Sequence, residues 1–178
     1  MRVFFANHTS HLDAVVLWGA LPTPLRARTR PVAARDYWER GPLRRYLARR
    51  VFRALLVDRN PAAGGDKLAA AQATIAALLQ ALQSGDSLIV FPEGTRGDGG
   101  DVAPFKSGLY HLALRAGTAE LVPVYLENLN RILPKGEVLP VPVLGSVRFG
   151  TPLVLQSGEE KSAFLARARE AVRMLRPA

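Results

Sequence analysis

Cysteine is absent from this 178-residue chain, which excludes disulfide bonds, thiolate nucleophiles and thiolate metal ligands. Long hydrophobic runs are also missing. The longest largely apolar stretch, residues 68–82, is broken by Gln72, Thr74 and Gln80, and it is shorter than the roughly 18 residues that a membrane-spanning helix needs. The apolar stretch after Met1 is too short for a secretory signal peptide. We therefore expect a protein that is soluble or attached to a membrane surface.

Acidic residues are few relative to basic ones, 15 against 24, which gives a net charge of +9. The excess is concentrated between Arg26 and Arg53, where ten arginines face only Asp36 and Glu39. Such a density favours an anionic partner, although a solvated basic face is the alternative explanation. Aromatic residues make up only 7% of the chain, and no recognition helix or RNP-type motif is visible, so we do not expect nucleic-acid binding.

The remaining composition is that of an ordinary globular protein, with 48% hydrophobic and 22% charged residues. Apolar runs of strand length alternate with longer helical patterns, which indicates an α/β sandwich around a partly parallel sheet. No repeat or linker interrupts the pattern, so residues 1–178 are expected to form a single domain. We predict strands at 3–6, 53–57, 87–91, 120–126 and 143–149, and helices at 10–21, 66–83, 107–116 and 158–175.

Ionisable side chains follow three of these strands at the point where each strand ends. The first loop reads NHTSHLD (Asn7–Asp13), the second DRN (Asp58–Asn60) and the third PEGTR (Pro92–Arg96). In folds of this class, catalytic residues collect in the loops at the carboxyl ends of the strands. These three loops therefore define the candidate site.

The first loop offers a general base. His8 and Asp13 flank the expected helix start, so the carboxylate can reach the imidazole, fix its tautomer and stabilise the imidazolium. Ser10 and Asp13 also fit an S-x-x-D capping box, in which Asp13 only satisfies a backbone N–H. Zinc is a weaker alternative, because His11 and Asp13 are two positions apart and H-E-x-x-H spacing is absent. On spacing alone, two roles stay open for Asp13, as the partner of a general base and as a cap of a backbone N–H. His11 is expected to be a loop or helix-start residue that supports its neighbour.

The other loops carry cations that suit an anionic group. Arg59 and Arg96 stand at strand ends, where they can hold a phosphate bidentately. Lys106 precedes a helix start, where free N–H groups also favour anions. Surface ion pairs, Glu93 with Arg96 for example, are the alternative explanation.

Four motifs in one order resemble the glycerolipid acyltransferase family, whose members include the 1-acylglycerol-3-phosphate acyltransferases. NHTSHLD matches the H-x4-D block, and it is followed by LLVDR (Leu55–Arg59), FPEGTR (Phe91–Arg96) and LVPVY (Leu121–Tyr125). PFKSG (Pro104–Gly108) also resembles the segment that follows the third block. The resemblance implies the glycerol-3-phosphate acyltransferase-like sandwich, with a mixed, largely parallel central sheet flanked by helices and the H-x4-D motif near the N-terminus.

The resemblance also implies a chemistry. His8 is expected to deprotonate a glycerol hydroxyl with Asp13 as its partner, and the hydroxyl then attacks the thioester of acyl-CoA or acyl-acyl carrier protein. A tetrahedral intermediate collapses and releases the thiol. The thioester is a co-substrate, and neither a cofactor nor a metal is expected. The implied acceptor is a lysophospholipid, above all 1-acylglycerol 3-phosphate, and the implied product is phosphatidic acid for phospholipid biosynthesis.

The same resemblance assigns the binding residues. Arg59 and Arg96 are expected to hold the acceptor phosphate, Glu93 to position its glycerol part, and Pro123 to shape the acyl-donor site. Lys106 is added as a further phosphate ligand on helix-start electrostatics alone. The residues expected to bind substrate are Arg59, Glu93, Gly94, Thr95, Arg96, Lys106 and Pro123.

One departure concerns the membrane. Many relatives carry membrane-embedded or amphipathic helices before the H-x4-D block, whereas seven residues precede His8 here. Either a preceding segment is missing, or attachment comes from elsewhere. Residues 41–53 offer such a place, because Leu43, Tyr46, Leu47 and Val51 recur at helical spacing among arginines. A basic amphipathic helix of this kind can lie in an anionic bilayer surface, and an ordinary packed helix is the alternative.

The expected location is therefore cytoplasmic, peripheral on the inner face of the cell membrane. Two further functions stay open. The acceptor can be a different lysophospholipid or another lipid, and the chain can be a catalytically inactive membrane-binding module of the same fold. Retention of His8, Asp13 and Glu93 argues against the inactive module.

Overall fold

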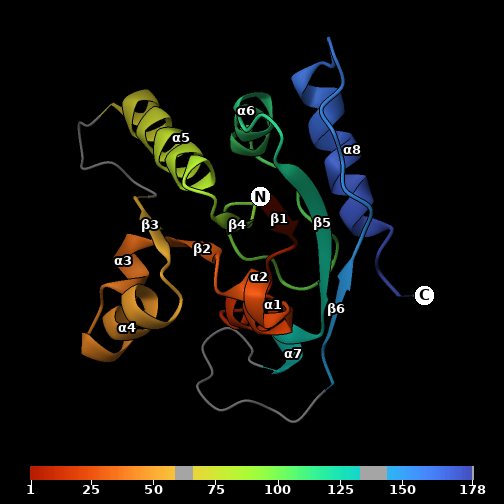
Figure 1. Ribbon diagram of the computed structural model, residues 1–178. Coiled ribbons are helices and arrows are strands. Elements are labelled where there is room, and N and C mark those ends of the chain that lie inside the picture. Colours follow the sequence, from red (N-terminus) through yellow and green to blue (C-terminus); the bar gives the residue numbers. More distant parts are fainter. Residues whose placement is uncertain (59–65, 133–143, 178) are drawn as a thin grey trace.

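The computed structural model describes residues 1–58, 66–132 and 144–177. Its strands are β1 (Arg2–Ala6), β2 (Thr29–Ala34), β3 (Leu55–Val57), β4 (Ser87–Val90), β5 (Glu120–Glu127) and β6 (Ser146–Phe149). They form one six-stranded sheet in the order β3-β2-β4-β1-β5-β6 (Figure 1). All neighbouring strands are parallel except β6, which pairs antiparallel with β5. The mixed, largely parallel sheet confirms the expected fold class.

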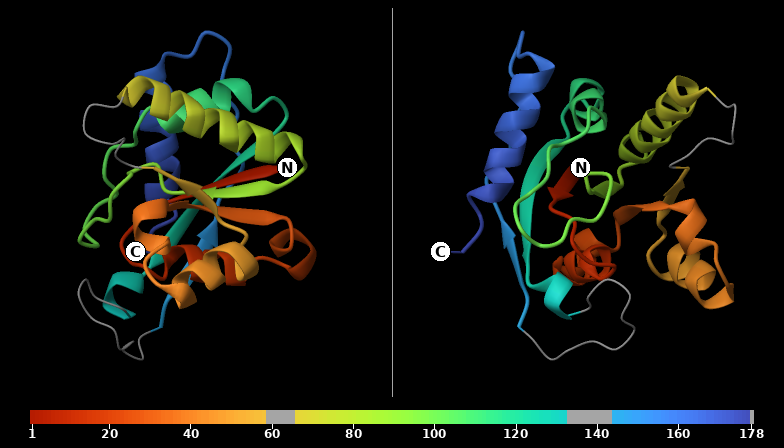
Figure 2. Two further views of the ribbon diagram at one scale, coloured as in Figure 1. Left: turned by 90° about the vertical axis from the view of Figure 1, so that its left-hand side faces the viewer. Right: turned by 180° about the vertical axis from the view of Figure 1, so that it is seen from behind.

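Helices cover both faces of this sheet and make three layers (Figure 2). Helices α5, α6 and α8 lie on one face, and α1 and α7 lie on the other; α3, α4 and the π-helix η1 project beside β2 and β3. None of the helices in the described ranges combines the length and apolar character that a bilayer crossing demands. The helices are α1 (Asp13–Ala20), α2 (Thr23–Arg26), α3 (Arg35–Trp38), α4 (Pro42–Tyr46), η1 (Leu47–Val51), α5 (Lys67–Gln83), α6 (Gly108–Arg115), α7 (Leu129–Ile132) and α8 (Lys161–Arg173).

The side chains of β1 alternate between the two layers of helices that cover the sheet. Val3 and Phe5 belong to the core cluster that includes apolar residues of α5, α6 and α8. Phe4 and Ala6 belong to a second cluster with Leu17 of α1 and with residues of α7. Successive side chains of a strand point to opposite faces of the sheet. A continuous apolar run therefore suits a parallel strand that is buried on both faces.

Most expected elements are present, and each difference has a physical reason. Strand β2 was not predicted, because its sequence TRPVAA contains Arg30 and Pro31 and lacks a β-branched run. Helix α1 begins at Asp13 and not at Ser10, because the intervening residues belong to the loop that carries His8. The apolar pattern of residues 66–83 predicts Leu68 on the apolar side of the helix, and this is wrong, since Leu68 is 65% exposed. The expected strand at 143–149 is β6, and residue 143 lies outside the described ranges.

The expected helix at 41–53 is divided into α4 and η1. Only Ala48 of this segment is fully buried, while Leu43 and Tyr46 are 69% and 59% exposed. Leu43 and Tyr46 are thus not packed into the core, as the apolar side chains of an ordinary amphipathic helix in a globular protein would be.

Candidate active site

Two of the motif loops meet because their strands are neighbours. Phe5 of β1 lies opposite Val90 of β4 in parallel register, so both chains leave the sheet at the same edge. The loops then bond to each other, since the Gly97 N–H donates to the carbonyl oxygen of His8 at 2.8 Å. The sheet edge therefore brings H-x4-D and FPEGTR together, as the strand-end argument predicted.

His8 and Asp13 lie in direct contact, as the sequence predicted. Nδ1 of His8 lies 2.8 Å from Oδ2 of Asp13, whose side chain is fully buried. A carboxylate can only accept a hydrogen bond, so the proton sits on Nδ1 and the lone pair on Nε2. Because the His8 ring also lines a cavity, this tautomer is the one that a general base needs.

Asp13 caps the loop as well. Its Oδ2 accepts hydrogen bonds from the backbone N–H groups of Thr9 at 2.6 Å and Ser10 at 2.9 Å. The same oxygen therefore makes both kinds of contact that spacing left open, one to the imidazole and one to the backbone. The backbone bonds hold the carboxylate in place, and the carboxylate in turn orients the imidazole.

Aromatic stacking restrains both histidines of the loop. The His8 ring stacks on Phe91, with 4.3 Å between centroids, and the His11 ring stacks on Tyr37 of α3 at 4.5 Å. The guanidinium of Arg44 covers the Tyr37 ring, 4.6 Å from its centroid. Burial and the positive charge of Arg96 lower the pKa of His11 to about 4. His11 is therefore neutral at physiological pH, and no sequence motif pointed to Tyr37 as its partner.

Glu93 is buried at 5% exposure, and both of its oxygens bond to backbone groups. Oε1 accepts from the His8 N–H at 2.7 Å, and Oε2 accepts from the Ala103 N–H at 3.0 Å. Burial raises the pKa of Glu93, and these two bonds oppose that rise. Among the ion pairs of the described residues, the alternative pair of Glu93 with Arg96 is not found.

The cavity beside His8 has a volume of about 450 Å³. One part of its lining is polar and includes His8, His11, Arg96 and Lys106. The apolar part comes from β2, β4, α5 and α6; it includes Val32, Ile75, Leu78, Val90, Leu109 and Leu112. Residues of and just after α3 also line the cavity, among them Asp36 and Arg40. A cavity with a few polar groups at one part and apolar walls elsewhere suits an amphiphilic substrate.

Three cations line this cavity, Arg40, Arg96 and Lys106, and the last two differ in how they are held. Arg96 makes no ion pair with any residue in the described ranges, so its guanidinium is available to a ligand. The stem of Lys106 crosses over Gly94, where a Cβ added to the glycine would stand 2.5 Å from Nζ. Gly94 has a φ of +73°, which favours glycine. Glycine at this position thus permits both the turn and the approach of Lys106.

The other predicted binding residues lie elsewhere. Thr95 is exposed and does not line the cavity, and Glu93 lies behind the loop, toward Ala103. Pro123 is buried in β5 opposite Phe5, and it contributes nothing to the cavity wall. Arg59 lies outside the described residues. No group of three or more potential metal ligands is found within the described ranges, so the zinc alternative gains no geometric support.

Comparison with known proteins agrees with this geometry. The Acyltransferase family profile matches residues 2–127. The chain is 30% identical to 1-acyl-sn-glycerol-3-phosphate acyltransferase of Salmonella typhimurium, over 71% of this chain and 46% of that protein. It is 34% identical to the enzyme of that name from Limnanthes alba, over 85% and 50%. It is 32% identical to 1-acyl-sn-glycerol-3-phosphate acyltransferase alpha of Homo sapiens, over 76% and 44%. The chain therefore spans at most half the length of these relatives.

The fold has a solved counterpart. The structure of the 1-acyl-sn-glycerophosphate (LPA) acyltransferase PlsC from Thermotoga maritima aligns with a TM-score of 0.69 at 21% identity. The alignment covers 97% of this chain and 63% of that one. Because the family profile covers most of the chain, including both loops that build the site, this chain belongs to the Acyltransferase family.

Proposed function

We propose that this protein transfers a fatty acyl group from a thioester, acyl-CoA or acyl-acyl carrier protein, to the free hydroxyl of a lysophospholipid. The preferred acceptor is 1-acylglycerol 3-phosphate, and the product is phosphatidic acid. The observation that carries this proposal is the His8–Asp13 pair, which stands beside a cavity with cations at its polar part and apolar walls. The names of the relatives point to the same acceptor class.

The geometry supports a direct transfer. Nε2 of His8 takes the proton of the acceptor hydroxyl while the oxygen attacks the thioester carbonyl, and Asp13 stabilises the imidazolium across the 2.8 Å contact. The tetrahedral intermediate then expels the thiolate, which takes up the proton from His8. The products are an ester and a free thiol, and His8 returns to its starting tautomer. Proton transfer by a positioned side chain contributes about 10²–10⁴-fold in rate.

The polar part of the cavity fits the head of the acceptor. Arg96 provides a planar guanidinium for bidentate contact with a phosphate, and Lys106 provides a point charge nearby. Arg59 remains part of this proposal as a third phosphate ligand. The apolar walls of β2, β4, α5 and α6 then take the acyl part of a substrate.

Thiol release from palmitoyl-CoA, measured with and without lysophosphatidic acid in anionic vesicles, tests the proposal. We expect acceptor-dependent release that His8→Ala abolishes, with His111→Ala on α6 as the matched control. Acyl-acyl carrier protein is the second donor to be tried. Equal inactivity of wild type and His8→Ala with both donors, by protein that still binds the vesicles, would favour the inactive membrane module.

We further propose that residues 35–52 (α3, α4 and η1), here called the basic arm, dock on an anionic membrane surface at the inner face of the cell membrane. Leu43 and Tyr46 are exposed on the arm, and Arg40 and Arg50 beside them form no ion pair with other described residues. The arm also lines the cavity through Tyr37 and its neighbours. Docking would therefore place the cavity close to the lipid substrates, and each basic residue near the surface contributes about 1 kcal/mol.

Vesicle binding tests the role of the basic arm. We expect the wild type to bind phosphatidylglycerol vesicles, with a change in tryptophan fluorescence, and to bind phosphatidylcholine vesicles weakly. Leu43→Asp with Tyr46→Asp should abolish binding, whereas Leu114→Asp on α6, where the leucine is similarly exposed, should not. If the double variant loses only activity with the carrier-protein donor, the arm binds that acidic protein and not the membrane.

A further inference from the structure

Glu93 belongs to a motif that the proposed reaction uses, yet its side chain is not in the cavity. Both of its oxygens accept hydrogen bonds from backbone N–H groups, one from His8 at 2.7 Å and one from Ala103 at 3.0 Å. Glu93 lines a different cavity, of about 410 Å³, together with Asp101 and Val102, and its residue exposure is 5%. Glu93 thus connects the loop of His8 to the segment that ends at Ala103.

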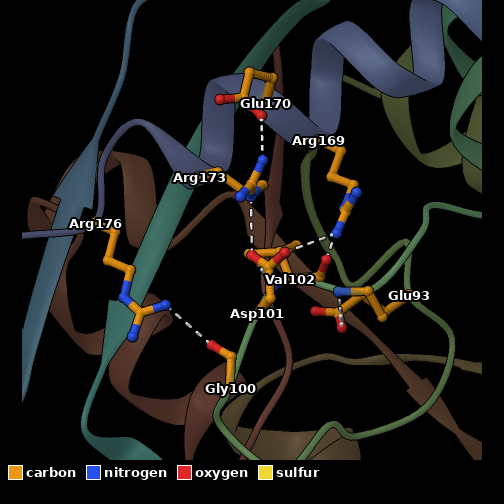
Figure 3. Close-up of polar contacts among 9 residues, drawn as sticks. Glu93, Gly100, Asp101, Val102, Arg169, Glu170, Arg173 and Arg176 are labelled. Atoms are coloured by element: carbon orange, nitrogen blue, oxygen red, sulfur yellow. Dashed lines mark hydrogen bonds and ion pairs between the residues drawn. The ribbon is translucent and has the colours of Figure 1, made fainter.

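That segment, residues 97–103, is attached to the C-terminal helix and the residues just after it by three arginines (Figure 3). Arg169 donates from Nε to the Val102 carbonyl at 2.6 Å and pairs with Asp101 at 3.0 Å. Arg173 pairs with the other oxygen of Asp101 at 2.9 Å. Arg176 donates to the Gly100 carbonyl at 3.2 Å. Asp101 is therefore held between two guanidinium groups of α8.

Apolar packing adds to these polar contacts. Val102 is 5% exposed and belongs to the same core cluster as Phe164, Ala168 and Val172, which lie along the buried side of α8. Its neighbour Ala103 carries the N–H that Glu93 accepts. The position of that N–H consequently depends on how residues 97–103 sit on α8.

We propose that Glu93, Asp101, Arg169 and Arg173 are positioning residues through which α8 fixes the backbone of His8. The chain of contacts runs from α8 to Asp101 and Val102, from Ala103 to one oxygen of Glu93, and from its other oxygen to the His8 N–H. The Gly97 N–H, at the start of the same segment, holds the His8 carbonyl at 2.8 Å. Both backbone groups of His8 are thereby fixed from residues 93–103.

This inference rests on the proposed function and replaces one role that the family resemblance implies. A residue that binds the acceptor substrate must contact it, whereas the two oxygens of Glu93 contact the backbone N–H groups of His8 and Ala103. The two roles predict different kinetics. Loss of an acceptor ligand raises KM for the acceptor, but loss of a positioning residue misplaces the base and lowers kcat. A displacement of about 1 Å is enough for a roughly 10²-fold effect.

Three variants test the inference by steady-state kinetics. Glu93→Gln keeps the size of the side chain but has one acceptor oxygen, and Arg169→Ala with Arg173→Ala releases Asp101. We expect kcat to fall between about tenfold and about 10²-fold in both, with KM for donor and acceptor within about twofold. Arg169→Lys combined with Arg173→Ala should recover part of the rate. A rise in the acceptor KM of Glu93→Gln at unchanged kcat would overturn the inference.

Arg167→Ala is the matched control on the same helix. Arg167 makes three hydrogen bonds, to both oxygens of Glu159 and to the Val154 carbonyl, and none of them involves residues 97–103. We expect it to leave kcat unchanged. An equal fall in kcat in Arg167→Ala and in the double variant would show general loosening of α8 and would overturn the positioning role.

Amide hydrogen exchange provides a readout that does not depend on activity. In the double variant we expect faster exchange in peptides that contain residues 97–103 and His8, and unchanged exchange in β4 and α5. In Arg167→Ala the same peptides should keep the wild-type rate. If the His8 and Ala103 amides exchange at the wild-type rate in the double variant, α8 does not position them. If that happens while His8→Ala abolishes transfer, only the inference fails, and the proposed function stands.

Discussion

Oδ2 of Asp13 accepts the Nδ1–H of His8 at 2.8 Å from a fully buried position. Replacement of Asp13 by Asn places an amide beside the ring. The backbone N–H groups of Thr9 and Ser10 also donate to the Oδ2 position, so the amide oxygen takes that place, and the imidazolium loses the negative charge that stabilises it. We therefore expect Asp13→Asn to lower kcat by about 10²–10⁴-fold, as measured by thiol release.

Glu120→Gln controls for the loss of a carboxylate. Glu120 pairs with Arg2 at the opposite end of the sheet and is half exposed. This change should leave kcat unchanged. If Asp13→Asn retains the wild-type rate although the protein is folded, the pair acts only as a cap of the loop and not as a base.

Arg96 should determine the affinity for a phosphorylated acceptor. Hydrogen bonds to a charged group contribute about 1.5–3 kcal/mol, which corresponds to roughly tenfold to 10²-fold in KM. We expect Arg96→Ala to raise KM for lysophosphatidic acid by that factor and to leave KM for monoacylglycerol, which has no phosphate, unchanged. Arg115→Ala, an exposed arginine at the end of α6, is the control. An equal change for both acceptors contradicts a phosphate-binding role.

Gly94 should tolerate no side chain. Its φ of +73° makes an alanine unfavourable by about 1–2 kcal/mol, and the new Cβ would displace the stem of Lys106 from the cavity. We expect Gly94→Ala to lower the free energy of unfolding in urea by about that amount and to raise the acceptor KM. Gly19→Ala in α1, where no atom lies within 4 Å of a Cβ, should be neutral or stabilising. Equal changes in stability and in acceptor KM for Gly94→Ala and Gly19→Ala would show that neither the positive φ of Gly94 nor its contact with Lys106 matters.

His11 should make the stability depend on pH. Burial, together with the charge of Arg96, lowers its pKa from 6.5 to about 4. Between these values the unfolded chain binds a proton that the folded protein does not, so the free energy of unfolding falls as the pH drops from 6.5 to 4. His11→Phe keeps a ring on Tyr37 without a titrating group, and its stability should fall less over this range. Urea unfolding of both proteins at several pH values measures the difference.

Some elements of the fold are determined by local sequence, and others by contacts between residues that are distant in the sequence. Expected strands such as 87–91 and the helix at 66–83 are present because a continuous apolar run and an Asp66 cap act over a few residues. Strand β2 was not predicted, because Arg30 and Pro31 interrupt the apolar pattern of a strand. Its pairing with β3 and β4 stabilises it. Local propensity cannot report such a strand, since its stability comes from neighbours that are distant in the sequence.

The sequence by itself determined the contact between His8 and Asp13, because the two are five residues apart and one loop suffices to join them. Only the tertiary structure decided the contacts of Glu93. Its partners are Ala103 and His8, and the latter is 85 residues away, across the contact between β1 and β4. A spacing pattern carries information about groups that a short segment can bring together. Which backbone group a buried carboxylate meets is set by how strands pair and where a distant helix packs.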